Sequence, residues 1–207
     1  MMGPNRKILL TSLVIPLICL ISFACQGQFF WLGFQAGEGV SWFSNPGYDS
    51  TRLSAGAGTS FGFFIRYGTR PYYQLGVEWL FSTNQMKFEV KPGTIKHDNV
   101  PFHSFKIPLT AGYEIIHKPR FKWRVGGGMF IGWNTILSSN SFNFTQGNLR
   151  NPQFGLIGET GIQYLNFLVL IDYNYSLSRF FDNDSGTYGV HLNSRLQIFA
   201  LKVGMQF

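Results

Sequence analysis

The sequence predicts an all-β fold: an eight-stranded antiparallel up-and-down β-barrel that spans a membrane. Three observations support it. Apolar residues alternate with small or polar ones in about eight runs, short connections alternate with long ones, and the chain starts with an export signal. Composition agrees, since aromatic residues make up 17% of the 207 residues and charged residues only 13%, against roughly 25% in soluble domains. This balance favours surroundings other than water.

The first part of the chain has the features of a secretory signal peptide. Two basic residues precede an apolar run from Ile8 to Phe23, and small residues follow it. The run is short for a transmembrane anchor and contains Pro16, so export is the better interpretation. We therefore predict a signal peptide over residues 1–27 and a barrel domain over residues 28–207.

Cysteine and charge point to no particular partner. Cys25 follows the apolar run and weakly matches a lipoprotein signal, which leaves lipidation open. The other cysteine, Cys19, lies in the predicted signal peptide, so the mature chain has no internal disulfide. The net charge is +7, but lysine and arginine are scattered singly, so no nucleic-acid partner is expected.

Eight stretches place apolar residues at alternate positions, as a strand with one apolar face does. The first sets Phe30, Leu32 and Phe34 against glycine, glutamine and serine residues, and the later stretches repeat this contrast. The sixth is the weakest, because Gly158 and Thr160 fall on its apolar face. In order, the predicted strands cover residues 30–42, 57–67, 73–82, 105–115, 122–134, 154–164, 169–177 and 199–207.

Connections between these strands alternate in length. The short ones lie at residues 69–72, 117–120 and 165–166, and the long ones, rich in polar residues, at 44–54, 82–101, 138–152 and 178–191. This alternation places all short turns at one end, the periplasmic end of an outer-membrane barrel. Within the fourth strand, Pro108 lacks the N–H that pairs neighbouring strands, and we expect a β-bulge there.

The chain ends on an aromatic residue, Phe207, inside the last predicted strand. An even number of strands returns this end to the periplasmic rim, where pairing with the first strand would prevent fraying. There Phe207 would join an aromatic girdle formed by Phe30, Tyr67, Tyr73, Tyr113, Trp123 and Tyr164.

These features, together with the stretch "FKIPLTAGYEI" at residues 105–115, resemble the small outer-membrane β-barrel proteins known as porin-family or PorT-like barrels. The architecture is similar to that of the OmpA membrane domain and of OmpX. The resemblance implies a monomeric barrel in the outer membrane of a Gram-negative bacterium. It also implies that the barrel-assembly machinery reads Phe207 as an assembly signal. It implies no shared enzymatic site.

Charged residues of the strands fall on the inward face by parity. They form an expected lumen charge network of Arg66, Glu78, Lys106, Glu114, Lys122, Arg124, Glu159, Asp172 and Lys202. One interpretation is an ion or proton path, and the other is a salt-bridged plug. We favour the plug, because side chains just fill a barrel of eight strands.

Two ion pairs are expected within this network, Arg124 with Glu159 and Asp172 with Lys202. Glu38 is the exception to the inward pattern, because its parity points outward. This suggests a bulge or a position at the outer rim.

No catalytic, cofactor or metal site is predicted, because the histidines lack the spacing of a metal site. An acyltransferase triad could be drawn from His191, Ser185 and Asp184, but such residues are common in loops. A soluble lipocalin-like barrel would invert the observed polarity.

We therefore expect an integral barrel in contact with outer-membrane lipid. Its expected role is structural or adhesive, or accessory to an envelope complex that could belong to a secretion system. An envelope protein or an extracellular ligand would bind through its outer loops. The alternative is a narrow diffusion channel for small solutes.

Overall fold

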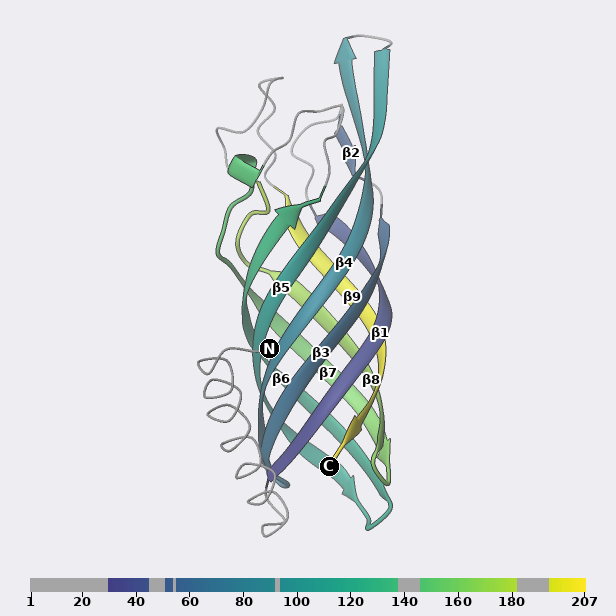
Figure 1. Cartoon of the computed structure of the whole chain (residues 1–207), viewed down its shortest axis with the longest axis vertical. Coiled ribbons are helices and arrows are strands. Elements are labelled where there is room, and N and C mark those ends of the chain that lie inside the picture. Colours follow the sequence, from purple (N-terminus) through teal and green to yellow (C-terminus); the bar gives the residue numbers. More distant parts are fainter. Residues whose placement is uncertain (1–29, 45–50, 54, 92–93, 138–145, 182–193) are drawn as a thin grey trace, which may run out of the picture.

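The computed structural model describes residues 30–44, 51–53, 55–91, 94–137, 146–181 and 194–207 (Figure 1). Eight long strands form one closed antiparallel barrel, which confirms the predicted fold class. A short strand, β2 (Thr51–Leu53), pairs with β4 alone, and η1 (Gln146–Asn148) is a single 3₁₀ turn. Among the described residues, no helix is long and apolar enough to cross a membrane. The barrel strands are β1 (Phe30–Ser44), β3 (Gly56–Gly68), β4 (Tyr72–Lys91), β5 (Thr94–His117), β6 (Phe121–Ile136), β7 (Gln153–Tyr164), β8 (Phe167–Ser176) and β9 (Arg195–Gln206).

The barrel closes between the first and last strands. β1 pairs with β9 from Gly33 opposite Gln206 to Ser44 opposite Arg195. Beyond the strand, the Phe207 N–H donates to the Leu32 carbonyl (2.7 Å), and the Leu32 N–H donates to the Phe207 carbonyl (3.1 Å). The final residue is therefore held at the end of the barrel that carries the short turns, as the sequence predicts.

The pairing register determines the shape of the barrel. Paired residues followed around the barrel from Phe30 on β1 lead back to β1 at Val40, a stagger of 10 residues over eight strands. With about 3.3 Å per residue and about 4.8 Å between strands, this stagger tilts the strands about 41° from the axis. The backbone radius is then about 8 Å. Each residue rises about 2.5 Å along the axis, so about ten residues cross an apolar band of about 25 Å.

The three predicted short turns are confirmed. They join β3 to β4, β5 to β6 and β7 to β8. In the first, Gly68 has a φ of +84°, a conformation that suits glycine. In the third, Leu165 has a φ of +54°. All three lie at one end, which corresponds to the periplasmic side of an outer-membrane barrel.

The predicted loop over residues 82–101 is wrong. There β4 and β5 continue as a paired hairpin, with Gln85 opposite Asn99 and Lys91 opposite Thr94. Figure 1 shows this hairpin projecting beyond the rest of the barrel. The period of two continues here, since Met86, Phe88 and Val90 alternate with charged residues. The stretch resembled a loop because it is polar overall and contains a Pro-Gly pair at residues 92–93.

The bulge expected at Pro108 is absent, and of the two alternatives for Glu38, a bulge or a position at the outer rim, the register excludes the bulge. Between β4 and β5, the register is the same on both sides of Pro108, and two rungs of the ladder are simply missing there. The proline thus removes a donor without adding a residue. Glu38 stays in register with Thr59 and Leu201, and its side chain is exposed and accepts a hydrogen bond from Thr59 Oγ1 (2.8 Å).

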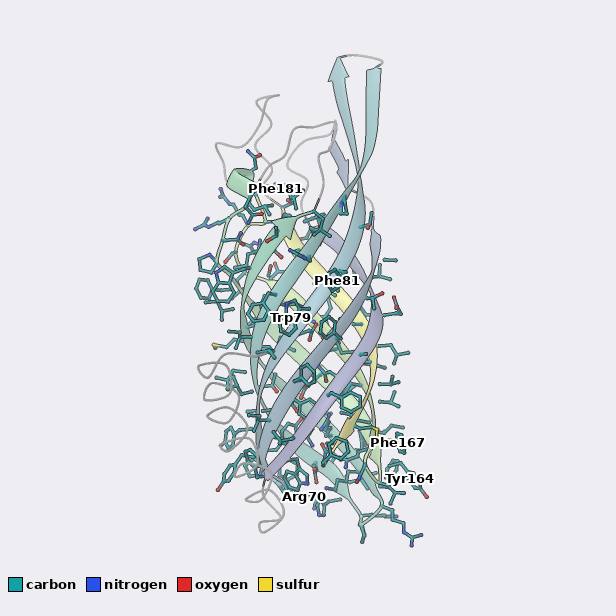
Figure 2. All side chains as sticks on the ribbon, in the orientation of Figure 1. Arg70, Trp79, Phe81, Tyr164, Phe167 and Phe181 are labelled. Atoms are coloured by element: carbon teal, nitrogen blue, oxygen red, sulfur yellow. The ribbon has the colours of Figure 1, made fainter. Side chains whose placement is uncertain are left out.

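The outward face of the barrel is apolar and aromatic. Phe61 stacks on Trp79, with ring centroids 5.3 Å apart, and Trp79 contacts Phe105 at 4.9 Å. Toward the end with short turns, Tyr164 and Phe167 are exposed (Figure 2). Large apolar side chains facing outward in a band, with aromatic residues toward its edges, are what a lipid environment stabilises.

Candidate functional site

The lumen is the candidate site, because parity turns the polar residues of every strand into it. All nine predicted lumen charges lie on the inward face. Seven of them are buried, the Lys122 side chain is 15% exposed, and Glu159 is half-buried. A buried charge requires a partner, so the contacts of these residues decide what the lumen can do.

Four of the charges form a network in the middle of the barrel, here called the central charge network: Glu78, Lys106, Asp172 and Lys202. Lys202 Nζ donates to Glu78 Oε2 (2.6 Å) and to Asp172 Oδ2 (3.1 Å). Lys106 Nζ lies 3.5 Å from Glu78 Oε1. Two cations thus face two carboxylates, and Asn174 Nδ2 adds a hydrogen bond to Asp172 Oδ2 (2.6 Å). The expected Asp172–Lys202 contact is present, but Glu78 is the closer partner of Lys202.

The remaining charges lie toward the short turns and are here called the periplasmic charge cluster: Arg66, Glu114, Lys122, Arg124 and Glu159. Three basic groups surround Glu114. Arg66 Nη1 and Lys122 Nζ each lie 3.9 Å from Glu114 Oε1, and His117 Nδ1 contacts Glu114 Oε2. One carboxylate therefore serves several cations at once.

The expected ion pair between Arg124 and Glu159 is absent. Glu159 Oε1 instead accepts a hydrogen bond from Tyr72 Oη (3.1 Å). The Tyr72 ring reaches across the lumen over Gly126, where a side chain would collide with it: a Cβ there would lie 2.7 Å from Tyr72 Oη. The sequence analysis placed Tyr72 in a turn, so it could not identify this competitor for Glu159.

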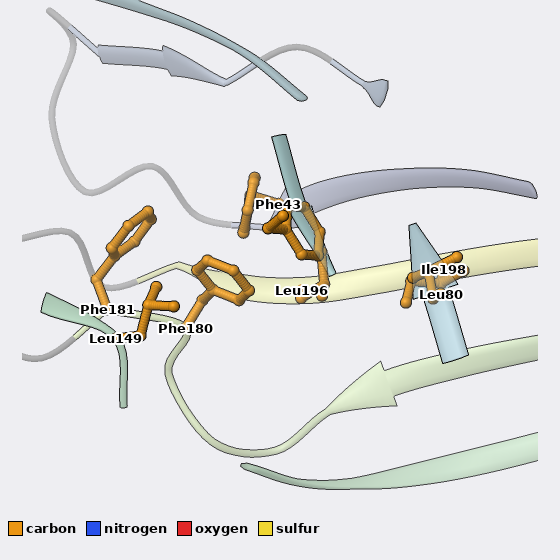
Figure 3. Close-up of a cluster of buried hydrophobic side chains, with 8 residues drawn as sticks. Phe43, Leu80, Leu149, Phe180, Phe181, Leu196 and Ile198 are labelled. Atoms are coloured by element: carbon orange, nitrogen blue, oxygen red, sulfur yellow. The ribbon is translucent and has the colours of Figure 1, made fainter. Parts of the chain in front are cut away.

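An apolar cluster closes the outer end of the lumen (Figure 3). Its rings meet edge to face: Phe180 lies 4.9 Å from Phe43, 5.2 Å from Phe102 and 5.0 Å from Phe181, between ring centroids. We call it the outer cap; its members are Phe43, Leu80, Phe102, Leu149, Phe180, Phe181, Leu196 and Ile198.

Backbone contacts hold the outer cap in place. The Arg150 N–H donates to the Phe180 carbonyl (3.1 Å), and the Phe180 N–H donates to the Ser194 carbonyl (2.8 Å). The sequence analysis missed the outer cap because its central residues lie in predicted loops. The available signal was the pair Phe180 and Phe181 within an otherwise polar stretch.

Two cavities lined by described residues lie in the lumen, and both are small. One of about 10 Å³ lies beside Lys106 and Asn174, and one of about 20 Å³ lies beside Glu159, Asp172 and Lys202. A single water molecule needs about 10–15 Å³ on this measure, so each cavity has room for about one.

The remaining candidates for chemistry are limited. Within the described ranges, no three histidine, cysteine, aspartate or glutamate residues lie close enough together to hold a metal ion. The possible triad of His191, Ser185 and Asp184 lies outside the described residues, as do Cys25 and the predicted signal peptide.

Comparison of structures finds other small outer-membrane barrels. Neisserial surface protein A is 16% identical, with 86% of this chain and 97% of that chain covered and a TM-score of 0.48. Ail of Yersinia pestis, solved with the heparin analogue sucrose octasulfate, is 13% identical, and the match covers 87% of this chain and 100% of Ail with a TM-score of 0.46. The N-terminal β-barrel domain of Pseudomonas aeruginosa OprF is 15% identical, and the match covers 88% of this chain and 100% of that domain with a TM-score of 0.39.

Comparison of sequences assigns the family. No curated protein matches the chain. The model of the family described as "Outer membrane protein beta-barrel domain" matches residues 26–182, which is most of the chain. The closed barrel, its apolar outer band and this match agree. The chain therefore belongs to the outer membrane protein β-barrel domain family and resides in the bacterial outer membrane.

Proposed function

We propose that the protein is a non-conducting outer-membrane barrel with a plugged lumen. Its role is structural or adhesive, or accessory to an envelope complex, and it acts through the segments that it presents outside the membrane. The observation that carries this proposal is the filling of the lumen, from the outer cap through the central charge network to the periplasmic charge cluster.

The outer cap and the central charge network oppose ion flow in different ways. The outer cap is apolar, and a narrow apolar constriction disfavours water and therefore ions. Below it, Lys202 and Lys106 are each held by a carboxylate, so their side chains occupy the axis of a barrel with a backbone radius of only about 8 Å. The cavities beside this network, of about 10 and 20 Å³, each have room for about one water molecule.

The hairpin of β4 and β5 supports a role outside the membrane. It extends the barrel wall beyond the outer end, and β2 adds a third strand through pairing of Thr51–Leu53 with residues 86–88 (Figure 1). A paired strand assembly is a firmer platform for a protein partner than an irregular loop, and its edges offer unpaired backbone groups.

Planar-bilayer recording tests the plugged lumen. We expect no stable open state from the purified protein. A matched variant with Phe180→Ser and Phe181→Ser should show brief, small openings, because it removes the central rings of the outer cap. Steady conductance of porin size from the unaltered protein would contradict the proposal and support the diffusion channel instead.

A pull-down from native membranes tests the role of the hairpin. The control is a variant in which a two-residue turn replaces residues 86–97; it keeps residues 72–85 of β4 and 98–117 of β5, and it removes the residues that pair with β2. We expect partners recovered with the full protein to be lost with this variant. Recovery of the same partners by both proteins would contradict a role for the hairpin.

A further inference from the structure

We propose that the periplasmic charge cluster binds a small oxyanion, such as phosphate, through the guanidinium groups of Arg124 and Arg66. This inference goes beyond the plugged-lumen function, because it concerns what the periplasmic layer of the lumen binds and not whether the lumen conducts. The evidence is a buried arginine without a protein partner, an excess of positive charge, and a position close to the periplasm.

Arg124 is fully buried, with 0% of its surface exposed. Among the residues that the structure describes, no carboxylate oxygen lies within 4.0 Å of it. None of its three guanidinium nitrogens has a hydrogen-bond partner in the protein. Its guanidinium carbon lies 5.9 Å from the centroid of the Tyr72 ring.

Arg66 contacts the same ring and is only partly satisfied. It too is 0% exposed, and its guanidinium carbon lies 4.6 Å from the Tyr72 ring centroid. Nη2 donates to Gln74 Oε1 (3.2 Å), and Nη1 lies 3.9 Å from Glu114 Oε1. Nε and Nη1 have no hydrogen-bond acceptor in the protein. Two guanidinium groups with free donors therefore lie close to the same aromatic ring.

The surrounding charges do not neutralise the pair. The cluster contains three permanent cations, Arg66, Lys122 and Arg124, against the carboxylates of Glu114 and Glu159. The Glu114 carboxylate contacts Arg66, Lys122 and His117 at once. The Glu159 carboxylate accepts a hydrogen bond from the Tyr72 hydroxyl. The central charge network, by contrast, balances two cations with two carboxylates. The excess positive charge is confined to the periplasmic end.

A buried arginine cannot escape this imbalance by losing its proton, because guanidinium stays charged in proteins. An uncompensated buried charge is strongly destabilising, so a bound anion would stabilise the folded barrel. The planar fork of N–H groups matches the paired oxygens of phosphate and carboxylate, and this match defines the chemical class of the ligand.

The site lies close to the periplasmic solution. β6 begins at Phe121, directly after the turn, and Arg124 follows three residues later. At about 2.5 Å per residue along the axis, Arg124 lies about 8 Å above the start of the strand. On this path the side chains of Lys122 and His117 are 15% and 38% exposed. These two basic groups would attract an anion from the periplasm toward the buried arginines.

Unfolding at constant ionic strength tests the proposal. The protein, purified from membranes in a non-ionic detergent, is unfolded with urea while inorganic phosphate replaces chloride. We expect a saturable rise in stability. At a phosphate concentration ten times the dissociation constant, the ratio of folded to unfolded protein should increase about 11-fold. ³¹P NMR line broadening of the phosphate should give the same dissociation constant independently of folding.

Variants locate the binding. Arg124→Met should abolish the phosphate dependence, and in phosphate-free buffer it should raise stability, because an unpaired buried charge is removed. Arg124→Lys keeps the charge without the fork and should weaken binding at least tenfold. Arg120→Met is the matched control: this residue is exposed in the neighbouring turn, so its replacement should leave the phosphate dependence unchanged.

Four results would overturn the proposal. The first is the absence of phosphate binding by NMR and by unfolding. The second is phosphate dependence that persists in Arg124→Met. The third is a loss of stability in Arg124→Met that is non-additive with Glu159→Gln, since this would show that Glu159 neutralises the arginine within the protein. A rise in stability produced only by micelles containing phosphatidylglycerol, and not by free phosphate, would assign the anion to lipid and overturn a free-ion site.

Discussion

Lys202→Met is expected to destabilise the barrel strongly, because Lys202 is the link between the two carboxylates of the central charge network. Its ammonium group contacts Glu78 at 2.6 Å and Asp172 at 3.1 Å, and the side chain is only 3% exposed. Without it, Lys106 is the one remaining cation of the network, and it lies 3.5 Å from Glu78. Asp172 would then retain only the amide of Asn174. One buried carboxylate would lack a counter-charge.

The magnitude follows from this contact pattern. Removal of one partner of a buried ion pair costs about 3 to 5 kcal/mol. The adjoining cavity of about 20 Å³ can admit one water molecule to hydrate Asp172, which favours the lower end of the range. A loss of about 3 kcal/mol corresponds to a decrease of about 140-fold in the ratio of folded to unfolded protein.

A double-mutant cycle provides the assay. Reversible urea unfolding in lipid vesicles, followed by tryptophan fluorescence, is measured for Lys202→Met, Asp172→Asn and the double variant. Asp172→Asn removes the stranded charge, so the double variant should recover about 2 kcal/mol relative to the sum of the single variants. Glu78→Gln combined with Lys202→Met should show coupling at least as large. Purely additive free energies would refute the network and the register that places these residues together.

Two further predictions concern assembly and packing. Deletion of Phe207 should reduce the amount of assembled barrel in cells much more than it lowers stability in micelles; normal assembly of the deletion variant would refute its role as an assembly signal. Gly128→Ala should destabilise the barrel by about 2 kcal/mol or more in urea unfolding, because a Cβ there would overlap the Leu109 carbonyl oxygen. Gly158→Ala is the matched control. No atom lies within 4 Å of its Cβ position, so it should change the free energy of unfolding by less than about 0.5 kcal/mol. Equal effects of the two alanine variants would show that strand spacing at Gly128 is not as described.

The sequence by itself determined the fold class, the face on which each strand residue lies, and the end at which the chain closes. These features depend on local rules. A period of two assigns alternate residues to lipid and lumen, and short polar turns between such runs leave adjacent strands antiparallel. The prediction was wrong for residues 82–101, where β4 and β5 continue as a paired hairpin. Apolar and charged residues still alternate at 86–91, but the polar composition and the Pro-Gly pair are typical of a loop.

Only the tertiary structure decided which lumen charges meet. Lys202 contacts Glu78, which is 124 positions earlier in the chain, and their strands β9 and β4 are separated by β1 and β3 around the barrel. Parity predicts that both side chains point inward, but it contains no information about contacts across the lumen. Those contacts depend on the stagger of the whole barrel and on side chains such as Tyr72, whose hydroxyl donates a hydrogen bond to Glu159. Arg124 is then left without a carboxylate partner among the described residues.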